Sequence, residues 1–104
     1  MERSGFKMFL LPGQADEYRR RHDALWPELR ELLYAHGVRN YSIYLDEASL
    51  TLFAYLEAPD LRALDALPTH PVMQRWWAYM GDIMATNADQ SPRQEFLLPM
   101  FYLA

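Results

Sequence analysis

The chain has 104 residues, of which 51% are hydrophobic and 14% aromatic, and it contains no cysteine. These values describe one folded domain, and they exclude a disordered segment, a disulfide framework, a thiolate nucleophile and a thiolate metal site. The formal charge is −4, and the only basic run is Arg19–Arg21, which a helix would spread around most of its circumference. Without an extended basic stripe, the sequence argues against a nucleic-acid partner.

No targeting or cofactor-binding segment is evident. Residues Met1–Gly5 lack the apolar core of a signal peptide, and no apolar stretch approaches the ~18 residues of a membrane-spanning helix. We therefore expect a soluble cytoplasmic protein with no membrane partner. The glycines stand singly along the chain, so there is no Gly-rich loop to cradle the phosphates of a nucleotide cofactor.

The N-terminal half begins with a strand predicted over Phe6–Leu11, followed by a Pro-Gly turn. A helical region then extends from about Ala15 to His36, where the next glycine provides a stop signal. Pro27 lies inside this region and lacks an amide hydrogen, and a proline disfavours helical geometry in the residue before it. We therefore predict that the helix breaks after His22 and restarts near the proline.

The rest of the chain contains three further strands and two helices. Alternating polar and apolar residues predict antiparallel strands over Asn40–Asp46 and Leu50–Glu57. Helices are expected over Leu61–Leu67 and Val72–Met84, and after a polar, turn-rich segment the apolar run Phe96–Leu103 predicts a terminal strand. The order β-α-β-β-α-β indicates an α+β, ferredoxin-like fold in a single domain covering residues 1–104.

The predicted strand Leu50–Glu57 carries information about assembly. Its alternate residues are apolar on both faces, with Phe53 and Tyr55 on the side opposite the leucines. Helices cover only one face of such a sheet, so a second copy of the chain is the simplest cover for the other. We predict a homodimer built as a face-to-face α+β barrel, in which the terminal strand with Pro99 reaches the partner. The alternative is a monomer with a ligand cavity between sheet and helices.

Tyr18, His22 and Trp26 follow one another at intervals of four residues. On a helix this spacing places neighbouring members on one face. Histidine exchanges protons near neutrality and aromatic rings offer flat surfaces to a ligand, so the spacing predicts a small acid–base site. The same spacing also fits an amphipathic helix whose Tyr and Trp pack into a core beside a solvated histidine.

The adjacent pair Trp76 and Trp77 indicates that at least one of the two indoles lines something other than the core. Consecutive helical side chains point about 100° apart, so both indoles cannot lie at the centre of one buried stripe. Aromatic planes pack against the C–H faces of sugars, while phenol and indole groups form hydrogen bonds with sugar hydroxyls. Taken alone, however, such a pair more often serves packing or an interface than a binding site.

Together these residues give the sequence a family resemblance. From end to end the chain resembles the L-rhamnose mutarotase family, through Tyr18, the Arg-Arg-His-Asp run ending at Asp23, Trp26-Pro-Glu-Leu29, Asn40-Tyr41-x-Ile-Tyr-Leu-Asp46, Gln74-Arg-Trp-Trp77-x-Tyr79-Met80 and Phe101-Tyr-Leu103. The resemblance implies a dimeric α+β barrel that binds L-rhamnose, with His22 as the proton donor. The sugar-binding positions that it implies are Tyr18, Tyr41, Trp76 and Trp77.

The implied reaction interconverts the α and β anomers of the pyranose. Ring opening needs a proton on the ring oxygen and loss of another from the anomeric hydroxyl, and no C–H bond breaks. We therefore expect neither a cofactor nor a metal. His22 is expected to act as the acid, while the proton acceptor stays open between water and a carboxylate such as Asp46 or Asp82. Tyr18 could position groups or relay protons, although an unperturbed phenol is a poor base at pH 7.

Two other kinds of function fit the same residues. Similar dimeric barrels include cofactor-free oxygenases and haem-binding enzymes, in which His22 and the aromatic side chains could form the pocket. A non-catalytic sugar-binding module could use the same site. His36 and His70 form a weak zinc pattern because neither belongs to an i, i+4 histidine pair, so we expect His36 at a helix end and His70 in a loop bounded by prolines.

Overall fold

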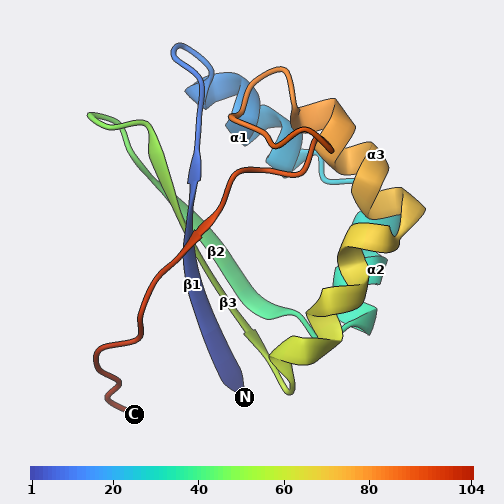
Figure 1. Ribbon diagram of the computed structural model, residues 1–104, viewed down its shortest axis with the longest axis vertical. Coiled ribbons are helices and arrows are strands. Elements are labelled where there is room, and N and C mark those ends of the chain that lie inside the picture. Colours follow the sequence, from blue (N-terminus) through green and yellow to red (C-terminus); the bar gives the residue numbers. More distant parts are fainter.

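The sheet and the helices form two layers. A computed structural model describes residues 1–104, with elements in the order β1 (Glu2–Phe9), α1 (Ala15–Asp23), α2 (Pro27–Ala35), β2 (Arg39–Asp46), β3 (Thr51–Ala58), the 3₁₀ helix η1 (Leu61–Thr69), α3 (Pro71–Met80) and β4 (Glu95–Phe96). The strands pair antiparallel in the order β2-β3-β1-β4. All helices lie on one side of this sheet (Figure 1). The predicted ferredoxin-like βαββαβ topology is confirmed.

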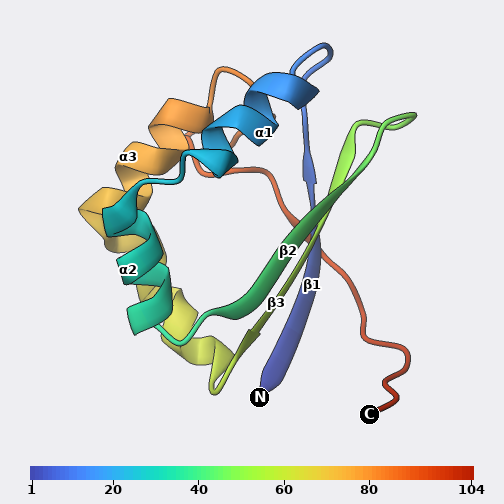
Figure 2. The ribbon, with the colours of Figure 1, turned by 180° about the vertical axis from the view of Figure 1, so that it is seen from behind.

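The predicted break in the long helical region separates α1 from α2. Trp26 has extended backbone angles (φ −60°, ψ 130°), and Pro27 occupies the first position of α2, where its missing amide hydrogen costs no hydrogen bond. Helix α1 ends at Asp23, one residue later than predicted. Figure 2 shows the resulting change of direction between the two helices. No helix has the length and apolar character needed to cross a bilayer.

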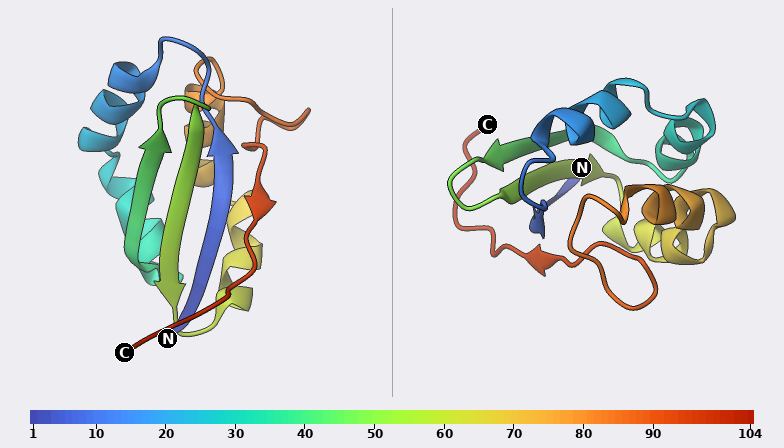
Figure 3. Two further views of the ribbon diagram at one scale, coloured as in Figure 1. Left: turned by 90° about the vertical axis from the view of Figure 1, so that its left-hand side faces the viewer. Right: turned by 90° about the horizontal axis from the view of Figure 1, so that it is seen from above.

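The two faces of the sheet differ in what covers them. Leu52, Ala54 and Leu56 of β3 are buried beneath the helices, together with Phe6 and Met8 of β1. On the opposite face, here called the outer face, Phe53 is 41% exposed and Tyr44 and Tyr55 are also exposed. No helix covers this face (Figure 3, left). The prediction that both faces are apolar and that helices cover only one is confirmed.

Several boundaries predicted from the sequence are wrong, including the end of the first strand, which is Phe9 and not Leu11. Strand β1 begins at Glu2 and not at Phe6, because its polar first residues pair with β3 as far as Ala58. Helix α3 ends at Met80 and not at Met84, with Gly81 as its C-cap. The segment predicted as Leu61–Leu67 continues to Thr69 and is a 3₁₀ helix with Pro68 inside it.

The terminal strand is also much shorter than predicted. Only Glu95 and Phe96 pair with β1, and one further hydrogen bond joins the Leu97 amide to the Gly5 carbonyl at 2.9 Å. Pro99 has no amide hydrogen to extend this ladder, and the chain leaves the sheet edge. The tail then crosses to the side of the outer face (Figure 1). There the Arg3 guanidinium lies 3.4 Å from the centroid of the Tyr102 ring.

Candidate active site

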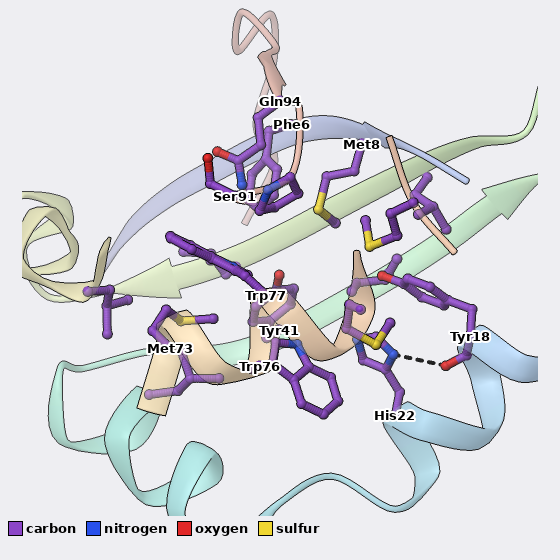
Figure 4. A pocket seen from close by; sticks show the side chains of 18 of the residues that line it. Phe6, Met8, Tyr18, His22, Tyr41, Met73, Trp76, Trp77, Ser91 and Gln94 are labelled. Atoms are coloured by element: carbon purple, nitrogen blue, oxygen red, sulfur yellow. Dashed lines mark hydrogen bonds between the residues drawn. The ribbon is translucent and has the colours of Figure 1, made fainter. Parts of the chain in front are cut away.

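A cavity of about 1670 Å³ lies between the sheet and the helices. It is larger than the roughly 300–1,000 Å³ of common ligand pockets, and most of its lining residues are hydrophobic. Every site residue predicted from the sequence lines it, namely Tyr18, His22, Tyr41, Trp76 and Trp77. Helix α1, strand β2 and helix α3 thus bring together residues that are distant in the sequence (Figure 4).

His22 is held by the backbone of its own helix. Its Nδ1 lies 3.0 Å from the carbonyl oxygen of Tyr18, one turn earlier (Figure 4). Because a carbonyl oxygen only accepts hydrogen bonds, Nδ1 carries the hydrogen and donates it, which leaves Nε2 of the neutral ring with its lone pair. Burial lowers the pKa of His22 below its ordinary value, and the hydrogen bond to the Tyr18 carbonyl opposes that shift only in part. The neutral form is therefore favoured near pH 7, with Nε2 as the nitrogen available for proton transfer.

Two of the phenols that line the cavity, those of Tyr18 and Tyr41, stay protonated near neutral pH. Burial raises the pKa of Tyr18 well above its usual range, and the nearby Tyr41 adds to the shift. Burial also raises the pKa of Tyr41 to about 12, although 39% of the residue surface is accessible along the open cavity. The register shifts by one residue between Arg39 and Ser42, so Asn40 and Tyr41 lie at an irregularity of the ladder, where side chains are re-aimed. Both phenols can therefore donate hydrogen bonds to a ligand, and neither can act as a base at pH 7.

The two adjacent tryptophans occupy different environments, as their angular separation on α3 predicts. Trp76 is only 6% exposed, and its indole meets the His22 ring edge-on at 5.4 Å and the Trp26 ring edge-on at 5.1 Å. Trp77 is half-buried and lies along the cavity (Figure 4). Trp76 therefore fixes the wall behind His22, while Trp77 offers more of its ring to a ligand.

The two carboxylates considered as proton acceptors lie outside the cavity. Asp46 accepts hydrogen bonds from the Ala48 amide and the Ser49 hydroxyl in the turn between β2 and β3. Asp82 pairs with Arg21 at 2.8 Å, and this hydrogen bond lowers the pKa of the Asp82 carboxyl. Neither residue lines the cavity, which argues against either of them as the proton acceptor.

The two other histidines lie at helix ends. Nδ1 of His36 bonds the Leu32 carbonyl at 2.9 Å at the end of α2, as predicted. His70 lies in the segment between two prolines and caps α3, where its Nδ1 accepts a hydrogen bond from the Val72 amide at 3.2 Å. The structure contains no cluster of three or more His, Asp or Glu side chains arranged to hold a metal ion.

Sequence reasoning missed several residues around the cavity. Ser91 and Gln94 belong to the turn-rich segment before β4 and lie across the cavity from α1 (Figure 4). Their sequence context has no periodicity, so no pattern singled them out. The sequence places Arg21 in a basic run and in the Arg-Arg-His-Asp motif, but neither indicates that it is buried and pairs with Asp82 from a distant part of the chain.

Comparison with known proteins decides the family. The family model for L-rhamnose mutarotase matches residues 3–103. This chain belongs to the L-rhamnose mutarotase family. The family resemblance seen in the sequence motifs is thereby confirmed, and the match favours neither the oxygenase nor the sugar-binding-module alternative.

Two family members illustrate how far the similarity extends. An L-rhamnose mutarotase of Brucella anthropi is 55% identical over 102 residues, which are 98% of this chain and 96% of that protein. The crystal structure of an L-rhamnose mutarotase from Formosa agariphila has a TM-score of 0.94 and 42% identity, with complete coverage of both chains.

A more distant structure shares only the fold. A dimeric ferredoxin-like protein from an uncultured marine organism has a TM-score of 0.58 and 11% identity, with coverage of 97% of this chain and 96% of that one. The predicted fold class, a ferredoxin-like chain of the dimeric α+β barrel type, is confirmed by these neighbours.

Proposed function

We propose that this protein is an L-rhamnose mutarotase, an isomerase that interconverts the α and β anomers of L-rhamnopyranose. The observation that carries the proposal is the position of His22 in a cavity whose walls also contain Tyr41, Trp76 and Trp77. Membership of the L-rhamnose mutarotase family over nearly the whole chain supports L-rhamnose as the substrate.

The walls of the cavity suit a 6-deoxy sugar. The Trp77 indole provides a flat surface for the C–H face of the pyranose, and the protonated phenols of Tyr18 and Tyr41 provide donors for its hydroxyl oxygens. Phe6 and Met8 on β1 give an apolar surface that fits the 6-methyl group better than a 6-hydroxyl group.

His22 carries out the proton transfer at the ring oxygen through Nε2. In the opening direction its imidazolium form donates a proton to the ring oxygen as the C1–O bond breaks, and the anomeric hydroxyl loses its proton to form the aldehyde. Rotation about C1–C2 then presents the other face of the carbonyl group. On closure the oxygen of the C5 hydroxyl attacks C1, the neutral imidazole recovers the proton of that hydroxyl, and the group that accepted the first proton returns one to the carbonyl oxygen, which becomes the new anomeric hydroxyl. Only O–H and C–O bonds change in this sequence.

Water accepts the proton of the anomeric hydroxyl in this proposal. The raised pKa values of Tyr18 and Tyr41 keep both phenols protonated, and Asp46 and Asp82 are engaged outside the cavity. The two carboxylates named from the sequence are therefore not used, and water is the acceptor that we propose.

Anomer exchange measured by NMR tests the proposed activity. Saturation of the α-anomeric proton of L-rhamnose should reduce the β-anomeric signal when the protein is added, because exchange becomes fast relative to relaxation. Run with L-mannose and L-fucose as well, the experiment also reports the breadth of the substrate range. A protein that broadens the sugar signals without accelerating exchange would be a binding module, and the proposed activity would be wrong.

We also propose that the protein acts as a homodimer formed through the outer faces of two sheets. Exposed Tyr44, Phe53 and Tyr55 supply an aromatic surface on that face, and the exposed apolar residues of the tail, Leu97–Leu103, extend toward the same side. Contiguous exposed apolar surface of this kind is typical of an interface. Two copies related by a two-fold axis would cover each other's outer face.

A further inference from the structure

Arg21 is the only charged residue that the fold buries, and its guanidinium joins α1 to the end of α3. It is 9% exposed. Its Nη1 donates to the Tyr79 carbonyl oxygen at 2.7 Å and to Asp82 Oδ1 at 2.8 Å, while Nη2 donates to Asp82 Oδ2 at 3.2 Å. Within α1 its Nε donates to Glu17 Oε2 at 2.7 Å. One side chain thus ties the helix that carries His22 to the helix that carries the two tryptophans.

A chain of ring contacts leads from this guanidinium back to His22. Arg21 lies over the ring of Tyr79, with 4.4 Å to its centroid, and Tyr79 stacks on Trp26 at 5.5 Å. Trp26 meets Trp76 edge-on at 5.1 Å, and Trp76 meets His22 edge-on at 5.4 Å. The imidazole is therefore held from two directions, by its own helix and by rings whose position depends on the end of α3.

We propose that Arg21 is a positioning residue for the mutarotase reaction. It fixes the C-terminal end of α3 against α1. In this way it keeps the His22 imidazole at a constant distance from the Trp76 and Trp77 indoles, against which the sugar stacks. This inference rests on the proposed function, because it concerns the geometry of the same proton transfer. Arg21 itself does not line the cavity and touches neither the sugar nor the reacting atoms.

The chemistry of the guanidinium explains why arginine suits this position. The planar guanidinium donates hydrogen bonds to both oxygens of the Asp82 carboxylate, and it also donates to a backbone carbonyl and to Glu17. A positive charge is favourable at the C-terminal end of a helix, which is where the Tyr79 carbonyl lies. Lysine has one compact charge and cannot reproduce all these directed contacts. Small displacements of catalytic groups are costly, on the order of a hundredfold in rate for about 1 Å.

Two substitutions test the proposal through kcat and KM for anomer interconversion. Arg21→Lys keeps the positive charge but loses the planar guanidinium and its several N–H donors. Asp82→Asn removes the carboxylate with which Arg21 pairs. Asp82 is 67% exposed in its side chain, so Asp82→Asn should fold. We expect kcat to fall on the order of tenfold to a hundredfold in both variants. KM should stay within about twofold, because neither substitution changes a residue that lines the cavity. Arg62→Gln, which breaks the exposed Arg62–Asp60 pair far from the cavity, should change neither constant.

A spectroscopic measurement separates positioning from mere stabilisation. The ¹⁵N signals of the His22 imidazole should report the Nδ1–H form in the wild type, and a mixture of the two neutral forms in Arg21→Lys and Asp82→Asn. Unchanged kcat and unchanged ¹⁵N signals at temperatures well below the melting temperature would overturn the proposal and leave Arg21 a purely structural role. A rise in KM with kcat unchanged would also overturn it, since it would place the effect in binding.

The two proposals fail in different ways. If the wild type does not accelerate anomer exchange, the proposed function is wrong, and the ¹⁵N signals alone then decide whether Arg21 positions His22. If the wild type is active and both variants match it, the proposed function stands and the positioning role is wrong.

Discussion

The His22 ring stacks on the Tyr18 ring, with 4.3 Å between their centroids and 28° between their planes, while its Nδ1–H donates to the carbonyl oxygen of that same tyrosine at 3.0 Å. Tyr18 thus fixes both the plane of the imidazole and the nitrogen that carries the hydrogen. Nε2 is the nitrogen left for a substrate, and burial keeps it mostly unprotonated near neutral pH.

His22→Asn should remove most of the mutarotase activity. General acid–base catalysis contributes on the order of 10²–10⁴-fold, so we expect kcat to fall within that range. Sugar affinity should change little, because the tryptophans and tyrosines of the cavity remain. His36→Asn is a matched control, since His36 bonds the carbonyl four residues earlier in the same way but lies outside the cavity. Near wild-type exchange in His22→Asn, measured by saturation-transfer NMR, would contradict the acid role.

The pH dependence of the catalysed rate should reveal the direction of proton transfer. Burial lowers the pKa of His22, so its acidic imidazolium form becomes populated only as pH falls through a value below about 6.5. As an acid, His22 should make kcat/KM rise as pH falls, with a plateau below that pKa. The rate without enzyme is subtracted at each pH, and His22→Asn should lack this limb. A rate that instead increases with pH through the same region would identify His22 as a base.

Tyr41→Phe should weaken sugar binding with little effect on the fold. Its phenol, with a pKa of about 12, stays protonated and donates a hydrogen bond. The loss of one such bond should raise the dissociation constant for L-rhamnose about fivefold, equivalent to about 1 kcal/mol. Isothermal titration calorimetry measures this, with Tyr55→Phe on the outer face as the control. Equal affinity in Tyr41→Phe and the wild type would remove Tyr41 from the binding site.

The two tryptophans should respond differently to truncation. Trp76→Ala empties a buried position and should lower the free energy of unfolding by about 3–5 kcal/mol. Trp77→Ala should destabilise the protein less and act mainly by raising KM, because more of its ring faces the cavity. Urea denaturation and KM measurements on both variants test this contrast. Equal losses of stability with KM unchanged in Trp77→Ala would show that both rings serve packing alone.

Phe53→Asp should dissociate the proposed homodimer. The substitution places a charge on the outer face beside Tyr44, its pairing partner on β2, where the second sheet would pack. Analytical ultracentrifugation should give twice the protomer mass of 12.3 kDa for the wild type and the protomer mass for the variant. Arg62→Gln, a change at an exposed side chain away from the outer face, is the control and should leave the mass at that of the dimer. A monomeric wild type would contradict the dimer.

Features that depend only on a short stretch of the chain could be predicted from the sequence. Pro27 dictated the break between α1 and α2, and the alternation in β3 predicted which of its side chains are buried. The spacing of Tyr18 and His22 predicted that they share one face of a helix, and in the structure their rings stack there. Tyr41 and the tryptophans came to the site through the family resemblance, and the structure brings them to the same cavity.

Features that depend on distant partners could not be predicted. Arg21 and Asp82 are 61 positions apart, and nothing in the local pattern of either residue indicates the other. The apolar run after Phe96 has the composition of a strand, but pairing requires a free edge and amide hydrogens, and the chain leaves the edge of β1 before Pro99. The predicted end of α3 is wrong for a related reason. Ile83 and Met84 are apolar and buried, but the segment that carries them is not helical.

A crystal structure of the protein with L-rhamnose would show which side chain faces the ring oxygen of the bound sugar. We predict that Nε2 of His22 lies within hydrogen-bonding distance of the ring oxygen, with the pyranose stacked on the Trp77 indole and Nδ1 still bonded to the Tyr18 carbonyl. A sugar bound elsewhere, or an Nε2 atom that faces solvent or protein with no sugar oxygen in reach, would contradict this prediction.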